Sequence, residues 1–557
     1  MSAPAALMKR PAASIGGALS LGGFALILAP LFFIALCLMN KFGIYEMPPG
    51  ARALVLFLML ISVMLTGMPI SIGLGLTVLI FIFTMTPIQV DVVALKLFTG
   101  IEKFEIMAIP FFILAGNFLT HGGVAKRMIN FATSLIGHWH GGLALAGVIS
   151  CAMFALVCGS SVATVVAIGS IILPEMVKHG YPMRFGAGVI TVAGSLGILM
   201  LPSIPKVIYA VSTNTSNGAL FIAGLLPGIL LTTMLCTVTW YLAKKHNYPR
   251  TATIGGRSSF RATLSAGRGL LTCLPILIYI PALLLAGLLE STLGDSTIPA
   301  MVLGAAKWFG IAQAIWLVVG YLCARFNFNM GLRNEGLNVW KAYWDSIWGL
   351  LLVVIIIGGI YSGIFTATEA AAMAAVYSFI CSVYIYGDLN IKDVPRVLLR
   401  SANMSAMLLY IITNAVLFSF VLTNENIPQA LADWLLGFNL GPWGFLLLVN
   451  LVLLVAGNFM EPSSIILIMA PIFFPAAMRL GIDPVHFGIL IDVNMEVGLC
   501  HPPVGLNLYV ASGISGLGIT ELTKAVLPWL LTMLVFLVIV TYWPWLTLVV
   551  PRMLGML

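Results

Sequence analysis

The sequence predicts an all-α, polytopic membrane protein that contains an inverted repeat. Three observations lead to this fold class: the composition, two small polar breaks between apolar arms, and a motif order that occurs twice. Of the 557 residues, 61% are hydrophobic and 8% are charged, whereas a typical soluble domain has about 25% charged residues. The formal net charge of +8 is not a nucleic-acid signal, because Lys and Arg in short loops of a membrane protein mark its cytoplasmic side. We therefore expect the lipid bilayer, and no nucleic acid, as its surroundings.

Residues 1–50 are expected to hold an extra transmembrane helix. Lys9 and Arg10 precede an apolar run from Leu21 to Leu38. This run is long for the apolar core of a cleaved signal peptide, and no small-x-small cleavage site follows it cleanly. We therefore expect the helix to be retained, with the N-terminus of the chain in the cytoplasm.

The first polar break is Gly159-Ser160-Ser161-Val162-Ala163-Thr164, inside the apolar stretch 143–177. Each arm beside it is shorter than the 20 or so residues that a spanning helix needs. We therefore predict a re-entrant hairpin, whose base is cytoplasmic because Lys178 and Arg184 follow it. Non-helical backbone at this depth occurs only where protein buries it or a watery cavity lies beside it, so the tip is a candidate site.

A broken helix is expected next, at 185–212. The run Leu201-Pro202-Ser203-Ile204-Pro205-Lys206 contains two prolines, which remove backbone donors and interrupt the helix. With the helices before the hairpin and one after this break, residues 51–242 form the first half of the repeat. Residues 243–345 are expected to form a basic cytoplasmic loop and an inserted helical hairpin at 270–323.

The second half of the repeat is expected at 346–557. A hairpin is predicted at 445–474, with its tip from Gly457 to Ser464, and a broken helix at 487–512 around Cys500-His501-Pro502-Pro503-Val504-Gly505. By the parity of the spans, the base of this hairpin faces outside. Before it, Thr366, Thr368 and Glu369 suit either a helix N-cap or a functional position.

The two units share spacings as well as order. Pro174 and Gly180 are six positions apart, as are Pro475 and Gly481 (180 − 174 and 481 − 475). Pro202 to Tyr209 and Pro502 to Tyr509 both measure seven (209 − 202 and 509 − 502). One unit is based inside and the other outside, which indicates an inverted repeat. Such repeats are typical of secondary transporters that bind their cargo at the bilayer midplane between broken helices.

A broken helix exposes unpaired N–H groups at one half and unpaired carbonyls at the other. Anions suit the first kind of end and cations the second. Hydroxyl, amide and carboxylate oxygens near the breaks are hard ligands, which suit a small hard cation better than a soft metal. The predicted cation ligands are Ser160, Ser161, Thr164, Asn214, Asn458, Glu461, Ser463, Asn494, Glu496 and Ser512. The predicted substrate-binding residues are Ser195, Pro202, Ser203, Lys206, Asp492, Pro502 and Pro503.

Other interpretations of the charged residues stay open at this point. Glu461, Asp492 and Glu496 suit cation ligation or proton coupling, and Lys206 suits pairing with a substrate carboxylate. Each also suits a structural ion pair or a side chain that extends to an interface. For His501, local hydrogen bonding is favoured over catalysis.

An enzyme is not expected. The sequence contains no GxxxxGK[ST], no HExxH and no Gly-x-Ser-x-Gly with a plausible triad. The eight cysteines are scattered without a CxxC pair, so neither a transition-metal site nor a disulfide framework is indicated. No cofactor is expected, and no residue is assigned a catalytic role.

Three motifs resemble the large membrane subunit of TRAP (tripartite ATP-independent periplasmic) transporters. They are Gly159 to Thr164, Gly363-Ile364-Phe365-Thr366-Ala367-Thr368-Glu369-Ala370-Ala371, and Pro502-Pro503-Val504-Gly505-Leu506-Asn507-Leu508. The resemblance runs from about Ala53 to Leu242 and from about Trp344 to the C-terminus. Asn458 to Ser464, with Met495 to Pro503, most resembles the C4-dicarboxylate branch. The chain departs from the family pattern at Ala367 and Leu201, where Pro is common, and at Lys206, where an apolar residue is common.

The resemblance implies an elevator-type importer of the ion-transporter superfamily, in a bacterial inner membrane, with Na⁺ as the coupling ion. It implies a periplasmic substrate-binding protein and a small four-helix membrane subunit as partners, and organic acids, in particular C4-dicarboxylates, as substrates. Two alternatives remain: a stand-alone Na⁺/dicarboxylate carrier of the same architecture, and a passive channel.

Overall fold

The structure is a computed structural model that describes residues 21–45, 47–66, 68–137, 139–200, 202–249, 339–361, 364–437, 441–458, 460–502 and 505–557. Residues 250–338 lie outside the described residues, and with them the inserted hairpin and most of the basic loop expected at 243–345. Within the described ranges every regular element is helical, and nine helical segments are long and apolar enough to cross a membrane. The prediction of an all-helical, polytopic membrane protein is therefore confirmed at this level.

The first group of helices precedes the first hairpin. The long apolar run after residue 50 is divided into two helices, because one helix ends at Leu65 and Pro69 directly precedes the next. The elements of this group are α1 (Leu21–Lys41), α2 (Pro49–Leu65), α3 (Ile70–Met85), α4 (Val90–Thr99), η1 (Phe104–Met107), α5 (Ala108–His121) and α6 (Val124–Ile136).

The second group contains the first hairpin and the first broken helix. Helices α7 and α8 pack against each other and are joined at Gly159 and Ser160. The Ser160 hydroxyl accepts a hydrogen bond from the Ala163 N–H and so caps α8. The elements are α7 (Gly142–Cys158), α8 (Ser161–Lys178), α9 (Met183–Ala193), α10 (Leu196–Leu199), α11 (Ile204–Thr213), α12 (Asn217–Ala223) and α13 (Leu225–Lys245).

The third group leads to the second hairpin. Thr366 and Glu369 form a capping box at the start of α17, because each side chain bonds the other residue's backbone N–H. This confirms the helix-cap interpretation of these two residues. The elements are α16 (Val339–Tyr361), α17 (Ala367–Ile380), η2 (Cys381–Ile385), η3 (Ile391–Asp393), α18 (Val394–Asn424) and α19 (Ile427–Gly437).

The last group holds the second hairpin and the second broken helix. The Asp483 carboxylate caps α22 by accepting from the N–H groups of Val485 and His486. The elements are α20 (Gly441–Gly457), α21 (Pro462–Arg479), α22 (Pro484–Cys500), α23 (Leu506–Ser515), α24 (Ile519–Tyr542) and α25 (Trp545–Met553).

The helix bounds repeat at a constant offset. Helices α8 and α21 both have 18 residues, and their ends are 301 positions apart (462 − 161 and 479 − 178). The starts of α9 and α22 keep the same offset (484 − 183 = 301). The two hairpins and the helices that follow them are therefore equivalent units of the chain.

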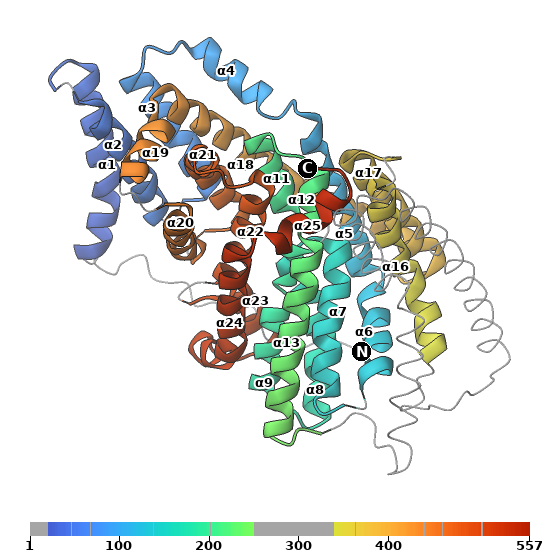
Figure 1. Cartoon of the computed structure of the whole chain (residues 1–557). Coiled ribbons are helices and arrows are strands. Elements are labelled where there is room, and N and C mark those ends of the chain that lie inside the picture. The colour runs from blue at the N-terminus through green and yellow to red at the C-terminus, as the bar shows by residue number, and fades with distance from the viewer. Residues whose placement is uncertain are drawn as a thin grey trace, which may run out of the picture.

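The helices pack as an inner core with a flanking layer. In the core, α22 contacts α10, α11 and α12, and α24 contacts α9 and α13, so the two equivalent units are interleaved. In the flanking layer, α5 runs along α17 and α18, and α18 also packs on α3. Figure 1 shows α1, α2 and α3 at one side of the molecule and α16 and α17 at the other, with the core helices between them.

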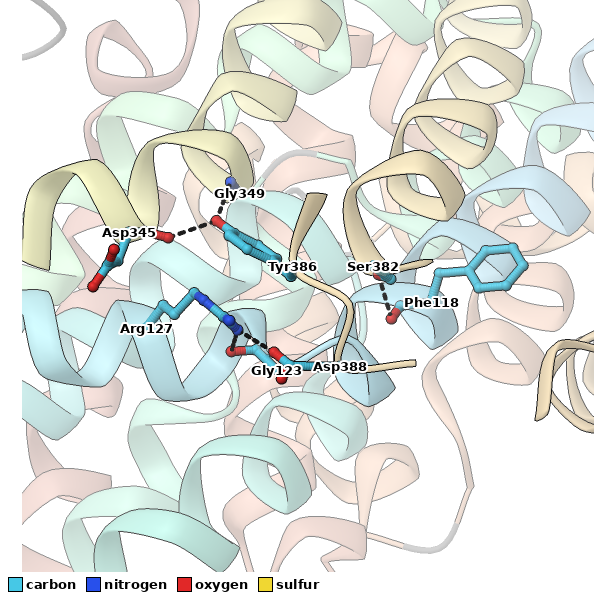
Figure 2. A network of polar contacts seen from close by, with 8 residues as sticks. All are labelled: Phe118, Gly123, Arg127, Asp345, Gly349, Ser382, Tyr386 and Asp388. Carbon is cyan, nitrogen blue, oxygen red and sulfur yellow. Dashed lines mark hydrogen bonds and ion pairs between the residues drawn. The ribbon is translucent and has the colours of Figure 1, made fainter. Parts of the chain in front are cut away.

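Helix α6 connects the flanking layer to the first hairpin, and a polar network holds it to α16 and to the turn after η2 (Figure 2). Arg127 pairs with Asp388 and lies over the ring of Tyr386, 3.9 Å from its centroid. The Tyr386 hydroxyl donates to the Asp345 carbonyl at 2.7 Å and accepts from the Gly349 N–H at 3.2 Å. Since stacking, an ion pair and hydrogen bonds act together here, the start of α6 is fixed to the flanking layer.

Candidate functional site

The first hairpin tip lies directly against the first helix break. Gly159 has φ +62°, and a Cβ placed on it would meet the Pro202 carbonyl oxygen at 2.0 Å. A Cβ on Gly197, at the start of α10, would meet the backbone of Ser160 and Ser161 at 2.6 to 2.7 Å. Only glycine permits both this backbone conformation and these approaches. The predicted residues Ser160, Ser161 and Pro202 are therefore brought together.

A buried hydrogen bond joins this tip to the second unit. The Ser161 hydroxyl lies 2.9 Å from Oδ1 and 2.6 Å from Nδ2 of Asn507, which follows the second break. Nδ2 of Asn507 also donates to the Thr191 carbonyl of α9 at 3.4 Å. Both Ser161 and Asn507 are buried, with 4% and 0% exposure. The contact connects residues 346 positions apart, so the two units meet at the tip of the first hairpin.

The second hairpin tip bonds to its own unit. Asn458 Oδ1 lies 2.8 Å from His501 Nδ1, at the second break, which confirms that His501 takes part in local hydrogen bonding. Gly457 and Gly498 approach so closely that a Cβ on Gly498 would meet the Gly457 Cα at 2.8 Å. The carboxylate of Glu461 accepts from the Ser464 hydroxyl at 3.5 Å. Two of the predicted cation ligands, Asn458 and Glu461, are therefore at this tip, and Ser463 is buried next to them.

Three charged residues are buried between the units. Lys206 on α11 is 1% exposed, and Asp492 and Glu496 on α22 are 1% and 0% exposed. The Lys206 ammonium group donates to the carbonyl of Leu199, the last residue of α10, and both carboxylates exert an electrostatic attraction on it. None of the four carboxylate oxygens has a hydrogen-bond partner among the described residues.

The Lys206 ammonium lies close against Gly224. A Cβ on Gly224 would meet its Nζ at 2.2 Å and the Leu199 carbonyl at 2.5 Å. With all three groups in their ordinary ionised forms, the cluster would carry one positive charge and two negative charges. A net negative charge without hydrogen-bond donors is costly to bury. Such a cluster attracts a further cation, and it makes Lys206 an internal counter-charge instead of a free partner for a substrate carboxylate.

The remaining predicted ligands lie in other surroundings. Asn494 donates to Oδ1 of Asn450, on α20, at 2.7 Å, and its own Oδ1 has no hydrogen-bond partner within the described ranges. Thr164 donates to the Ser160 carbonyl at 2.8 Å, next to the first tip. Ser195 donates to the Val192 carbonyl at 2.8 Å, and the buried Ser203 hydroxyl has no partner among the described residues. Pro502 is partly exposed at the second break, and Pro503 lies outside the described residues.

The structure does not bring Asn214 and Ser512 to the tips. Asn214 ends α11 in a left-handed conformation, and its Oδ1 accepts from Lys103 at 3.2 Å. Since a helix rises about 1.5 Å per residue, the ten residues of α11 place Asn214 about 15 Å from the first helix break. Ser512 donates to the Leu517 carbonyl at 2.6 Å and stabilises the turn after α23. A helix break marks only one end of each half-helix as a site, and these two residues lie toward the other end.

Asn507 was not among the predicted site residues. Its signal was available, because it is a polar amide in the quoted motif that follows Pro502 and Pro503 in otherwise apolar sequence. Thr191 contributes through its carbonyl, which no side-chain pattern identifies. The protein lacks a recognisable transition-metal site in the part of the chain that the structure describes, since no group of three His, Cys, Asp or Glu is close enough there.

Comparison with known proteins gives a consistent family. The model of the family "Tripartite ATP-independent periplasmic transporter, DctM component" matches residues 57–303 and 279–546. The chain is 57% identical over 518 residues to the C4-dicarboxylate TRAP transporter large permease protein DctM of Rhodobacter capsulatus, covering 90% of this chain and 100% of that protein.

Two further relatives carry the same printed name. The Pseudomonas aeruginosa protein is 45% identical, with 84% of this chain and 91% of that protein covered. The Vibrio cholerae protein is 39% identical, with coverage of 90% and 97%. The matched family and these relatives are transporter permeases and not enzymes. The chain belongs to the family of DctM components, the large permease subunits of tripartite ATP-independent periplasmic transporters.

Proposed function

We propose that this chain is the large membrane subunit of a Na⁺-coupled, binding-protein-dependent importer of organic acids, with C4-dicarboxylates as its substrates. The observation that carries the substrate class is the 57% identity over the full length of a relative named a C4-dicarboxylate permease. High identity over a whole permease extends to the residues around its cargo, which supports a shared substrate class.

The geometry supports the proposed mechanism. The constant offset of 301 residues between the two units fits an inverted repeat with re-entrant hairpins and broken helices. The core of interleaved units is the part that would move, in an elevator-type exchange, against the flanking layer that contains α3, α5, α17 and α18. Gly123, with φ +69°, directly precedes the connecting helix α6, and Gly141, with φ +72°, directly precedes α7, and backbone freedom at these two positions would permit the movement.

Coupling to Na⁺ is supported by the ligand chemistry of the two tips. Hydroxyl, amide and carboxylate oxygens and helix-end carbonyls gather at Ser161, Asn458 and Glu461. Such ligands prefer a hard monovalent or divalent cation to a soft metal. A negative cluster at Asp492 and Glu496 adds an attraction for cations in the same core.

The partners and the membrane orientation are also part of this proposal. A small four-helix membrane subunit and a periplasmic binding protein would complete the importer in a bacterial inner membrane. Lys178 ends α8 and Lys244 lies at the end of α13, and the Tyr181 hydroxyl donates to the Pro249 carbonyl between the loops that follow them. These basic residues therefore share one end of the spans, which supports a cytoplasmic position for that end, and we place the N-terminus on the same side.

The test is uptake of radiolabelled succinate into proteoliposomes, with and without a Na⁺ gradient, the small subunit and the binding protein. We expect uptake only when all three are present. Uptake by this chain alone would favour a stand-alone carrier, and flux that ignores the Na⁺ gradient would favour a passive channel. Ser161→Ala and Asn494→Ala are each expected to raise the Na⁺ concentration needed for half-maximal uptake, with Ser170→Ala on an exposed part of α8 as the control. An unchanged Na⁺ requirement in both variants would reject them as ligands.

A further inference from the structure

A cavity of about 320 Å³ lies between the flanking layer and the core, apart from the two tips. Its walls come from α4 and α18 on one side and from α11 and α21 on the other. Figure 1 shows α4 crossing the end of the molecule at which α11, α18 and α21 are labelled. We call this cavity the vestibule. Its rim is exposed at Thr99, Lys103 and Thr423, and its deep side is formed by the buried Ile208 and Leu467.

The vestibule has the charge pattern of an anion site. Lys96 and Lys103 line it, and no carboxylate occurs among the described residues of its wall. The hydroxyls of Ser212 and Thr423 also line it, but each already donates to a carbonyl of its own helix at 2.9 Å, and the rest of the wall is mainly apolar. Two ammonium groups and an apolar wall fit a small organic acid, whose carboxylates are separated by a short carbon chain.

Two elements of the vestibule lead directly to the candidate site. Helix α11 begins at Ile204 beside the first break, and α21 begins at Pro462 beside the second hairpin tip. Ile208 and Leu467, on the deep side of the vestibule, are therefore one to two turns from these starts, or about 6 to 8 Å along each helix. A ligand in the vestibule is in contact with the same two helices that form the site.

Lys103 connects the vestibule to the end of α11. Its ammonium group donates to the Val211 carbonyl at 2.8 Å and to Asn214 Oδ1 at 3.2 Å. It therefore compensates the carbonyls and the negative dipole end of α11, from a segment of the flanking layer. An anion that binds Lys103 competes for these hydrogen bonds and loosens the hold of the flanking layer on α11.

We propose that the vestibule is a loading site for the organic acid, in which Lys96 and Lys103 bind a substrate carboxylate before it reaches the two tips. This inference rests on the proposed function as an organic-acid importer. Substrate binding in the vestibule is then a separate step that precedes binding at the tips. Lys103 has a second role, because it gives up its hydrogen bonds to the end of α11 when it binds the substrate carboxylate. Loading of the substrate therefore releases the end of α11 from the flanking layer.

The binding test uses a cysteine in the wall and no transport. Ser419→Cys is labelled with a small maleimide in nanodiscs that contain the permease and the small subunit, and the rate is compared with that of the unsubstituted chain. We expect succinate to slow labelling at least threefold, and Lys103→Gln in the same background to abolish this protection. Thr520→Cys, an exposed position outside the vestibule, is the matched control and should be labelled at one rate with or without succinate.

Lipid headgroups carry the same anionic chemistry, so the lipid composition forms a second arm. If phosphatidylglycerol nanodiscs block labelling of Ser419→Cys and succinate has no effect in phosphatidylcholine nanodiscs, the vestibule is a lipid site and the proposal is overturned. Equal labelling under all these conditions overturns it as well.

The transport test separates this proposal from the proposed function. In the complete system, Lys96→Gln and Lys103→Gln are each expected to raise the KM for uptake about threefold, with Vmax within twofold, and Lys392→Gln is expected to change neither. If the unsubstituted chain takes up no C4-dicarboxylate, the proposed function is wrong. If the unsubstituted chain takes up succinate, and both variants have the same KM and the same protection from labelling as the unsubstituted chain, only the proposal of a loading site is wrong.

Discussion

The two hairpin tips have the same place in their units and differ in what holds them. The first tip is bonded across the units, from Ser161 to Asn507, and both residues are buried. The second tip is bonded within its own unit, from Asn458 to the partly exposed His501. The two hairpin tips are therefore equivalent in the repeat, but only the first is hydrogen-bonded to the other unit in these two contacts.

This difference indicates which tip can move alone. Displacing the first tip from Asn507 takes from the buried Ser161 hydroxyl its hydrogen bond to Asn507 and leaves the buried Asn507 amide with one partner fewer, which is costly. Displacing the second tip breaks a contact close to the surface, where water can replace a lost partner. We expect the first tip to stay with the core and the second to open more readily.

The largest effect is expected from the buried charge that both units share. Lys206→Met removes the only cation of the Lys206, Asp492 and Glu496 cluster and leaves two buried carboxylates without a counter-charge. We expect a loss of about 3 to 5 kcal/mol in the free energy of unfolding, seen as a lower midpoint of thermal unfolding in detergent. Lys392→Met, at an exposed position in η3, is the control. An unchanged midpoint for Lys206→Met, or a lack of recovery on adding Asp492→Asn, would contradict the charge balance described here.

The next effect tests the close packing of the first tip. Gly159→Ala combines a left-handed backbone with a clash against the Pro202 carbonyl. Gly481→Ala has a similar φ of +73° but nothing within 4 Å of the added carbon. The left-handed conformation alone costs roughly 1 to 2 kcal/mol, so the control measures this cost. We expect Gly159→Ala to destabilise further and to abolish succinate uptake. Equal midpoints and equal uptake for the two variants would show that the approach of tip and break is not required.

Much of this arrangement was predictable from the sequence. Apolar runs too short for a full span, with Gly, Ser and Pro between them, identified both hairpins and both breaks, because length and backbone chemistry are local properties. The capping box at Thr366 and Glu369 was predictable for the same reason. The partner of Ser161 was not, because the direction in which a buried side chain points depends on how helices pack around it. Asn214 and Ser512 lie toward the ends of their half-helices that are away from the breaks, which composition does not reveal, and their role as cation ligands stays a prediction.

A smaller effect is expected from the cross-unit hydrogen bond itself. Asn507→Ala leaves the Ser161 hydroxyl buried with one partner fewer, which costs about 1 to 3 kcal/mol. In a double-mutant cycle with Ser161→Ala, we expect a coupling energy of about 1 kcal/mol, since the two side chains are in direct contact. Thermal unfolding of the four proteins provides the measurement. If the losses of stability in Ser161→Ala and Asn507→Ala simply add in the double variant, the hydrogen bond does not couple the two units. The proposed difference between the first and second tips would then be wrong.

The smallest effect is expected at the second tip. Asn458→Ala removes the hydrogen bond to His501, and we expect a loss of about 0.5 to 1 kcal/mol because His501 is partly exposed and can bond water instead. The same variant should speed maleimide labelling of a cysteine placed at Met460, a partly exposed residue of this tip, because a weaker contact raises the open fraction. Asn507→Ala should leave that labelling rate unchanged. If it also speeds labelling at residue 460, the two tips open together, and their separate connections do not give them separate movements.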